Sequence, residues 1–185
     1  SGKSELKNFS KLEIVNQPIF FHGDAFFSGF YLNEVLLRLC PLEVEMPQTF
    51  SQYSKTLEQL QKLSQQADQN LFLRQILRQF EHELLEDLGY AIDFSVDSNQ
   101  EQISSEMNYQ FQLNDGFLAT AQASRSAVSG ALIKTMMQYE KSRKFNLEQL
   151  QLLTKLYRQV ITSLLGDRPL KSRQLWVQNA QTHRQ

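Results

Sequence analysis

Three long segments of this chain repeat apolar residues every three or four positions, the spacing that places them on one face of an α-helix. The segments span residues 24–40, 68–88 and 146–165. Asp68 and Asn146 are suitable N-cap residues for the second and third segments, and Gly89 and Gly166 follow them, where glycine commonly ends a helix. Because amphipathic helices must bury their apolar faces against one another, the chain is predicted to be mainly α.

Shorter patterns complete this prediction. Further helices are expected over residues 47–65, from Ser126 or Ser129 to about 139, and from 168 to about 179. Strand-like alternation occurs over residues 4–15, 90–96, 107–113 and 117–121. The last two strands flank Asp115-Gly116, a pair that suits a tight hairpin turn. The predicted fold is therefore a helical bundle with a small β-hairpin insertion and a residual N-terminal strand.

Few signs of catalysis or metal binding are present. The single cysteine, Cys40, excludes an intramolecular disulfide and a four-cysteine zinc site. The histidines are far apart in sequence: His22, His82 and His183. An acidic cluster is expected to be a solvated helix face: Glu81, Glu83, Glu86 and Asp87. No phosphate-binding loop, dinucleotide fingerprint or nucleophile elbow occurs, so we expect no enzyme, no cofactor and no metal.

Charge is distributed unevenly along the chain. The net charge is -1, but residues 1–124 carry -9 and residues 125–185 carry +8. Such a basic segment favours nucleic acid or an acidic peptide as partner, although a bipolar surface or internal neutralisation would give the same count. The candidate DNA-binding cations are Lys134, Lys141, Arg143, Lys144, Arg168, Lys171 and Arg173. The aromatic residues interleaved with them are Tyr139, Phe145, Tyr157 and Trp176, with Tyr157 expected in the core.

Membrane insertion and secretion are not indicated. No apolar run approaches the roughly 20 residues that span a bilayer, and the N-terminus has no signal-peptide pattern. An intracellular chain that lacks an upstream segment is therefore expected.

Three motifs, in this order, resemble the helical body of the RecO family of bacterial recombination mediators. They are the segments 27–36 (FSGFYLNEVL), 77–90 (LRQFEHELLEDLGY) and 168–176 (RPLKSRQLW). The resemblance implies that residues 1–17 are the last strand and linker of an otherwise missing OB-fold. Residues 18–185 would then be the helical domain, with a β insertion at about 90–122. In many such chains this insertion holds zinc through four cysteines, and here it contains none.

The resemblance also implies a function. RecO-like proteins bind and anneal single-stranded DNA, bind the acidic, Phe-ended tail of single-stranded-DNA-binding protein, and act with RecR to load RecA. A cytoplasmic, nucleoid-associated protein would follow. By position, the tail would contact Arg78 on the predicted 68–88 helix, with Lys155 and Arg158 opposite, in a groove between that helix and the 146–165 helix. Two alternatives stay open: an adaptor that binds acidic peptides without DNA, and an enzyme with a metal near Glu81 and Glu86.

Overall fold

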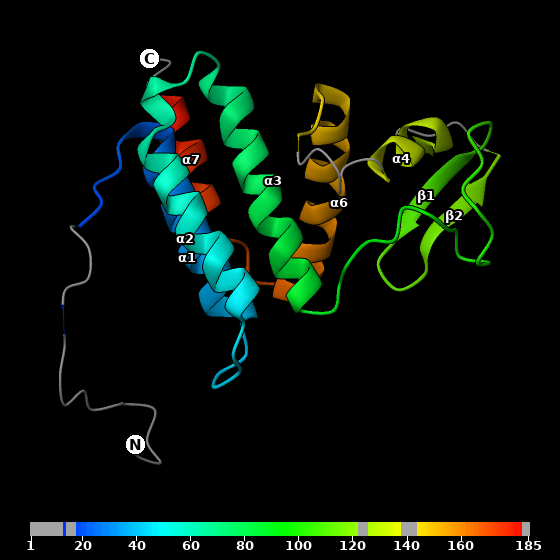
Figure 1. Cartoon of the computed structure of the whole chain (residues 1–185), viewed down its shortest axis with the longest axis horizontal. Coiled ribbons are helices and arrows are strands. Elements are labelled where there is room, and N and C mark those ends of the chain that lie inside the picture. The colour runs from blue at the N-terminus through cyan, green and yellow to red at the C-terminus, as the bar shows by residue number, and fades with distance from the viewer. Residues whose placement is uncertain (1–12, 14–17, 122–125, 138–143, 183–185) are drawn as a thin grey trace.

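A bundle of helices lies beside a small antiparallel sheet in the computed structural model, which describes residues 13, 18–121, 126–137 and 144–182 (Figure 1). The helices are α1 (Gly23–Leu39), α2 (Pro47–Gln61), the 3-10 helix η1 (Leu63–Gln65), α3 (Gln69–Asp87), α4 (Gly130–Met136), α6 (Leu147–Leu165) and α7 (Lys171–Thr182). The strands are β1 (Asn108–Gln112), β2 (Gly116–Thr120) and β3 (Val128–Ser129). The predicted class, mainly α with a small hairpin, is confirmed. The N-terminal strand predicted over 4–15 lies outside the described residues, apart from position 13, and stays a prediction.

Local signals set the ends of the two longest helices. The Asp68 carboxylate accepts a hydrogen bond from the Leu71 N–H at 2.9 Å, which caps α3. At α6, Asn146 Oδ1 accepts from the Gln149 N–H and Gln149 Oε1 accepts from the Asn146 N–H, a reciprocal capping box. Gly89 and Gly166 follow these helices with φ of 80° and 65°, a region that glycine occupies without strain. These four predicted helix ends are confirmed.

The sheet has the order β2-β1-β3, with all pairs antiparallel. The predicted hairpin is confirmed. Gln112 pairs with Gly116, so the hairpin loop has three residues between the paired positions. The strand predicted over 90–96 is wrong. In this segment only Val96 pairs, through an isolated bridge to Gln102, and the side chains of Ile92 and Phe94 pack against the core of the sheet without a ladder.

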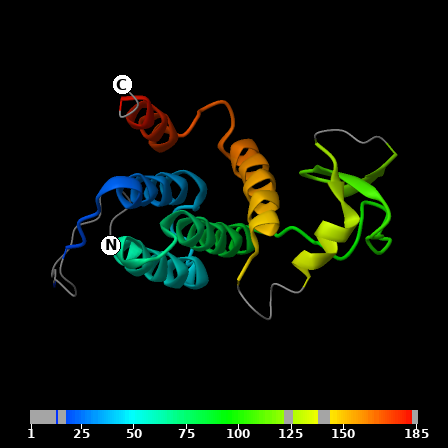
Figure 2. The same cartoon turned by 90° about the horizontal axis from the view of Figure 1, so that it is seen from above.

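Two hydrophobic cores adjoin where α3 contacts α6. Figure 2 shows the bundle helices on one side of this contact and the sheet on the other. The first core contains Leu32, Phe80 and their neighbours from α1, α2 and α3. The second joins the sheet, α4 and α6, and includes Tyr109 and Phe117, both almost fully buried. Leu39, at the end of α1, packs against both cores. Helix α6 therefore has bundle helices on one side and the sheet on the other.

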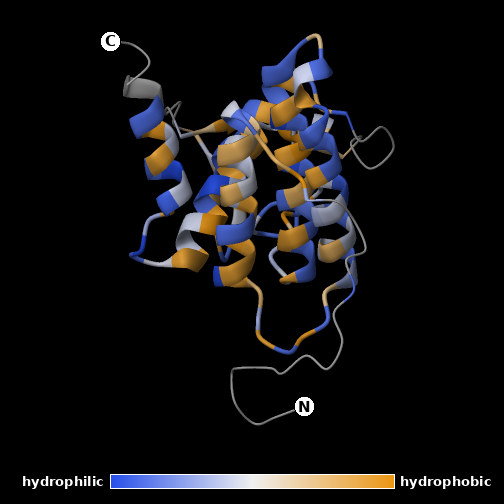
Figure 3. Ribbon diagram, turned by 90° about the vertical axis from the view of Figure 1, so that its left-hand side faces the viewer, coloured by the Kyte–Doolittle hydropathy of each residue, from blue (hydrophilic) through white to orange (hydrophobic). Residues whose placement is uncertain are grey.

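Helix α1 is less enclosed than its composition suggests, since Phe26, Phe30 and Leu37 are exposed. The loop joining α1 to α2 is also partly hydrophobic at its surface (Figure 3). A Cβ atom at Gly29 would lie 3.1 Å from the ring of Phe21, so the close neighbour that favours glycine there is an aromatic side chain just before α1. Among the described helices, none has the length and apolarity that a bilayer crossing requires.

Candidate functional site

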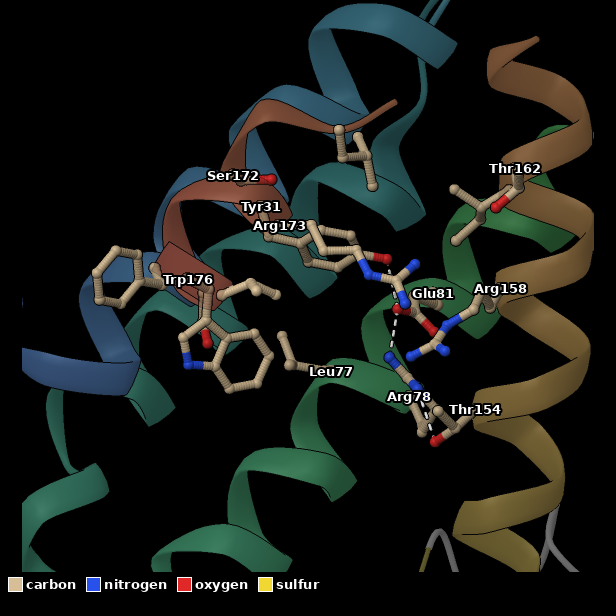
Figure 4. A pocket seen from close by; sticks show the side chains of 15 residues that line it. Tyr31, Leu77, Arg78, Glu81, Thr154, Arg158, Thr162, Ser172, Arg173 and Trp176 are labelled. Carbon is tan, nitrogen blue, oxygen red and sulfur yellow. Dashed lines mark hydrogen bonds and ion pairs between the residues drawn. The ribbon is translucent and has the colours of Figure 1, made fainter. Parts of the chain in front are cut away.

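A pocket of about 310 Å³ opens where α1, α3, α6 and α7 meet (Figure 4). Its apolar lining comes from all four helices and the turn before α7: Phe27, Leu77, Ile161, Leu170, Trp176 and Val177. Its polar lining includes three arginines and one glutamate: Arg78, Arg158, Arg173 and Glu81. Most ligand pockets combine an apolar lining with a few placed polar groups, and this pocket has that composition.

A buried hydrogen-bond network forms the polar wall of the pocket. Glu81 is 2% exposed, and its Oε1 accepts hydrogen bonds from Tyr31 Oη and Arg78 Nη2, both at 2.5 Å. Arg78 Nη1 donates to Thr154 Oγ1 at 2.8 Å, which ties α3 to α6. Burial raises the pKa of Glu81, and the neighbouring Arg78 opposes that rise. Burial, reinforced by the Glu81 charge, also raises the pKa of Tyr31 well above its ordinary value, so Tyr31 keeps its proton.

Two further arginines face the same carboxylate. Figure 4 shows Arg158 reaching from α6 and Arg173 from α7 toward Glu81. Within the described part of the chain, neither arginine forms an ion pair with an acidic side chain. Burial lowers the pKa of Arg158, and repulsion from Arg173 and Arg78 adds to the effect. With all four groups ionised the cluster carries two net positive charges, so an anion is its complementary ligand.

Helix α7 is held in place by two residues of α1. Glu34 accepts hydrogen bonds from the backbone N–H groups of Lys171 and Ser172, at 2.9 and 2.8 Å, and from Ser172 Oγ at 2.7 Å. Burial alone would raise the pKa of Glu34, but these hydrogen bonds and Arg38 together lower it. Arg38 donates to the carbonyls of Leu165, Arg168 and Pro169, between α6 and α7. Position 173 reaches the pocket because of this attachment.

The residues predicted to bind an acidic tail are only partly brought together. Arg78 and Arg158 line the pocket, from the two helices predicted to form the groove. Lys155 does not line it. Its Nζ donates to the Ser126 carbonyl at 2.6 Å, and its side chain borders a shallow depression on the outer side of α6.

The residues predicted to bind DNA fall into two groups. Lys134 and Lys144 are exposed near the N-terminal end of α6, and Arg168, Lys171 and Arg173 are exposed beyond its C-terminal end. The 19 residues of α6 separate the groups by about 28 Å of helix. Lys141 and Arg143 lie outside the described residues. Of the second group, Arg173 also lines the pocket.

Sequence reasoning missed the central residue of the site. Glu81 was expected on a solvated face; that expectation is right for Glu86, whose side chain is 61% exposed, and wrong for Glu81. The spacing alone indicates that Glu81 is buried, because Glu81 lies four residues after Leu77 and four before Leu85, on the apolar side of α3.

The aromatic residues interleaved with the cations differ in exposure, and metal-ligating residues do not cluster in the described part of the chain. Phe145 and Tyr157 are buried and cannot stack on bases, whereas Trp176 is 44% exposed; Tyr139 lies outside the described residues. The described ranges contain no group of three or more His, Cys, Asp or Glu residues placed to hold a metal ion.

Comparison with known proteins gives a consistent match. Residues 21–174 match the family described as the C-terminal part of recombination protein O. A DNA repair protein RecO from Pseudoalteromonas translucida is 34% identical over 95% of this chain and 72% of its own length. RecO from Pseudomonas putida strain W619 is 35% identical, covering 95% and 73%. RecO from Actinobacillus pleuropneumoniae serotype 7 is 33% identical, covering 95% and 70%.

Proposed function

Because this chain belongs to the RecO family of DNA repair proteins, we propose that it acts in recombinational repair as a mediator that binds single-stranded DNA and a protein tail. The tail is the acidic C-terminus of single-stranded-DNA-binding protein. In this proposal the role is binding and not catalysis. Capture of the tail would bring the protein to coated DNA, where it anneals strands and acts with RecR to promote RecA loading.

One observation carries the peptide-binding part of the proposal: arginines and an apolar wall line the same pocket. A C-terminal phenylalanine presents an aromatic ring and a carboxylate on adjacent atoms. In this proposal the ring would lie beside Leu77 and Trp176 and the carboxylate between Arg158 and Arg173, all of which line the pocket. Acidic residues upstream in the tail would then lie near the exposed cations at the start of α7. Arginine suits this task because its planar group holds a carboxylate through two hydrogen bonds.

Charge neutralisation supports the DNA-binding part. The exposed cations at the two ends of α6 can each neutralise a phosphate and release counterions, and this lowers the repulsion between strands during annealing.

The second candidate function is an adaptor that binds only acidic peptides, because the same exposed cations would also attract an acidic peptide. The position of Arg173 in the lining of the pocket favours this candidate. A titration of single-stranded DNA at low salt separates the two, because the adaptor would show no binding.

The peptide test uses a fluorescent acidic peptide that ends in Phe with a free carboxylate. Arg158→Ala and Arg173→Ala should each weaken binding about tenfold or more, because a charge-assisted hydrogen bond contributes about 1.5–3 kcal/mol. Lys155→Ala is the matched control: an exposed cation on the same helix whose Nζ bonds the Ser126 carbonyl. A peptide with a C-terminal amide should bind the wild type as weakly as the free acid binds the arginine variants.

Two outcomes would contradict the proposed tail site. If the acid and the amide bind alike, or if Lys155→Ala weakens binding as much as Arg158→Ala, the pocket is not the tail site.

A further inference from the structure

A buried carboxylate stands at the centre of a pocket whose arginines suit anions. Glu81 Oε1 accepts two hydrogen bonds, while Oε2 is buried and has no hydrogen-bond partner among the described residues. An unsatisfied buried acceptor is unfavourable, and an ionised carboxylate here opposes any incoming anion. Helix α3 nevertheless presents this carboxylate to the pocket, although glutamine would fill nearly the same volume.

Charged and titratable groups approach Glu81 from each helix that packs around it. Tyr31 comes from α1, Arg78 from α3, Arg158 from α6 and Arg173 from α7 (Figure 4). The next residue of α3, His82, turns away, and its Nδ1 lies 3.0 Å from Tyr157 Oη. Ionised Glu81 leaves two net positive charges in the arginine cluster, and protonated Glu81 leaves three.

We propose that Glu81 determines the specificity of this pocket by occupying the arginine cluster when the pocket is empty and by taking up a proton when a ligand carboxylate binds there. The proposal rests on the proposed function of the pocket. Two carboxylates that share one site raise the proton affinity of each other, and this favours protonation of the buried one. The added proton comes from solvent and is accommodated on Oε2, which then becomes a donor toward the ligand.

Three features of the site support this coupling. Desolvation raises the pKa of Glu81 in the free protein, so burial already favours the protonated form that the coupling requires. Tyr31 keeps its proton and donates to Oε1, which leaves Oε2 as the oxygen that gains one. The ligand carboxylate then faces three arginines and one neutral acid, so the repulsion between it and the Glu81 charge is removed when a suitable anion binds.

The coupling gives a defined pH dependence. Affinity for a carboxylate ligand should rise as the pH falls through the pKa that Glu81 has in the complex, by at most about tenfold per pH unit, because one proton is taken up. This window lies above the pH at which the acidic residues of the peptide themselves protonate, near 4.

Calorimetric titration of the Phe-ended acidic peptide in two buffers of different ionisation enthalpy counts the protons directly. Wild type should take up a measurable fraction of one proton near neutral pH. Glu81→Gln should take up almost none and should bind more tightly than wild type at pH 8. Glu86→Gln, an exposed carboxylate on the same helix, and His82→Gln should both keep the uptake of the wild type.

A second variant tests the same proposal if Glu81→Gln does not fold. Tyr31→Phe removes a hydrogen bond that favours the ionised carboxylate, so the proton-uptake profile should shift to higher pH. Peptide binding that is lost in Arg158→Ala but shows no proton uptake in the wild type would overturn the role of Glu81 alone. A peptide that does not bind the wild type, or binds Arg158→Ala equally well, would overturn the proposed function of the pocket as well.

Discussion

Gly130, at the start of α4, is the residue where the insertion leaves least room for a side chain. A Cβ atom there would lie 1.9 Å from the Ser104 carbonyl oxygen and 2.9 Å from the ring of Tyr109. The Gly130 N–H also donates to the Met107 carbonyl at 2.8 Å, and the Ser104 N–H donates to Tyr109 Oη. The loop before β1 and the start of α4 therefore fit together only if position 130 carries a hydrogen atom.

Gly130→Ala should lower the free energy of unfolding by about 3 kcal/mol, because the new methyl group meets backbone that cannot turn aside. Urea unfolding measures the change. Ala131→Gly, at the exposed next position of α4, is the control and should lower it by no more than about 1 kcal/mol. Equal effects of the two substitutions would show that the loop yields to a methyl group.

At the scale of elements, the attachment of α7 to α1 sets the shape of the pocket. Glu34 takes the place of an N-cap for α7, supplied from another helix, and Arg38 satisfies the carbonyls that follow α6. Helix α7 has three exposed apolar residues, Leu175, Trp176 and Val177, so packing alone secures it weakly. The carboxylate therefore contributes a large part of the stability of its docked position.

Glu34→Ala should free α7 and weaken peptide binding, while the free energy of unfolding falls by about 1–2 kcal/mol, as for loss of an N-cap. Emission of Trp176, the single tryptophan, reports undocking through a shift to longer wavelength. Glu45→Ala, at an exposed position in the α1–α2 loop, is the control and should change neither signal. Unchanged emission in Glu34→Ala would mean that apolar packing suffices to hold α7.

The docked state of α7 should also depend on pH. Because folding lowers the pKa of Glu34, its stabilising contribution is complete above the ordinary glutamate value and is lost as the pH falls through the lowered value. The tryptophan emission of the wild type should therefore shift as the pH falls below about 4.5. Glu34→Gln should show a smaller shift over the same range, and an identical shift would assign the transition to other carboxylates.

At the scale of the whole molecule, exposed cations lie at both ends of α6, and the proposed DNA-binding role predicts that a single strand crosses between them. If DNA crosses from one end to the other, a double variant at either end should weaken the binding of single-stranded DNA. The two double variants are Lys134→Glu with Lys144→Glu, and Arg168→Glu with Lys171→Glu. Each pair should also reduce the slope of log affinity against log salt by about 1.4, the value for two phosphates of a single strand. Fluorescence anisotropy over a salt series measures both quantities. A pair that leaves the slope unchanged lies off the path.

The sequence predicted the helices whose limits are set locally. Asp68, Asn146 and the glycines after α3 and α6 act through neighbours within a few residues, so pattern reading finds them. The segment 90–96 misled because its alternating apolar residues are buried by the sheet core without pairing. Strand β3, only two residues long, has no readable period.

The pocket was less predictable than the fold. Glu81 depends on Tyr31, which lies 50 residues earlier, and Arg173 reaches the pocket through contacts between α7 and Glu34, more than 130 residues apart. Local sequence periodicity does not predict contacts between residues so far apart in the chain. The resemblance to a family named Arg78, Lys155 and Arg158 as tail-binding residues, of which Arg78 and Arg158 line the pocket and Lys155 does not. Spacing alone could not separate pocket arginines from surface ones.

The sheet and the pocket lie on opposite sides of α6, and they share few residues of that helix. Substitutions in the hairpin loop should therefore have little effect on ligand binding in the pocket. A reporter grafted into the hairpin loop should therefore leave the opposite side of α6, and the pocket there, in place.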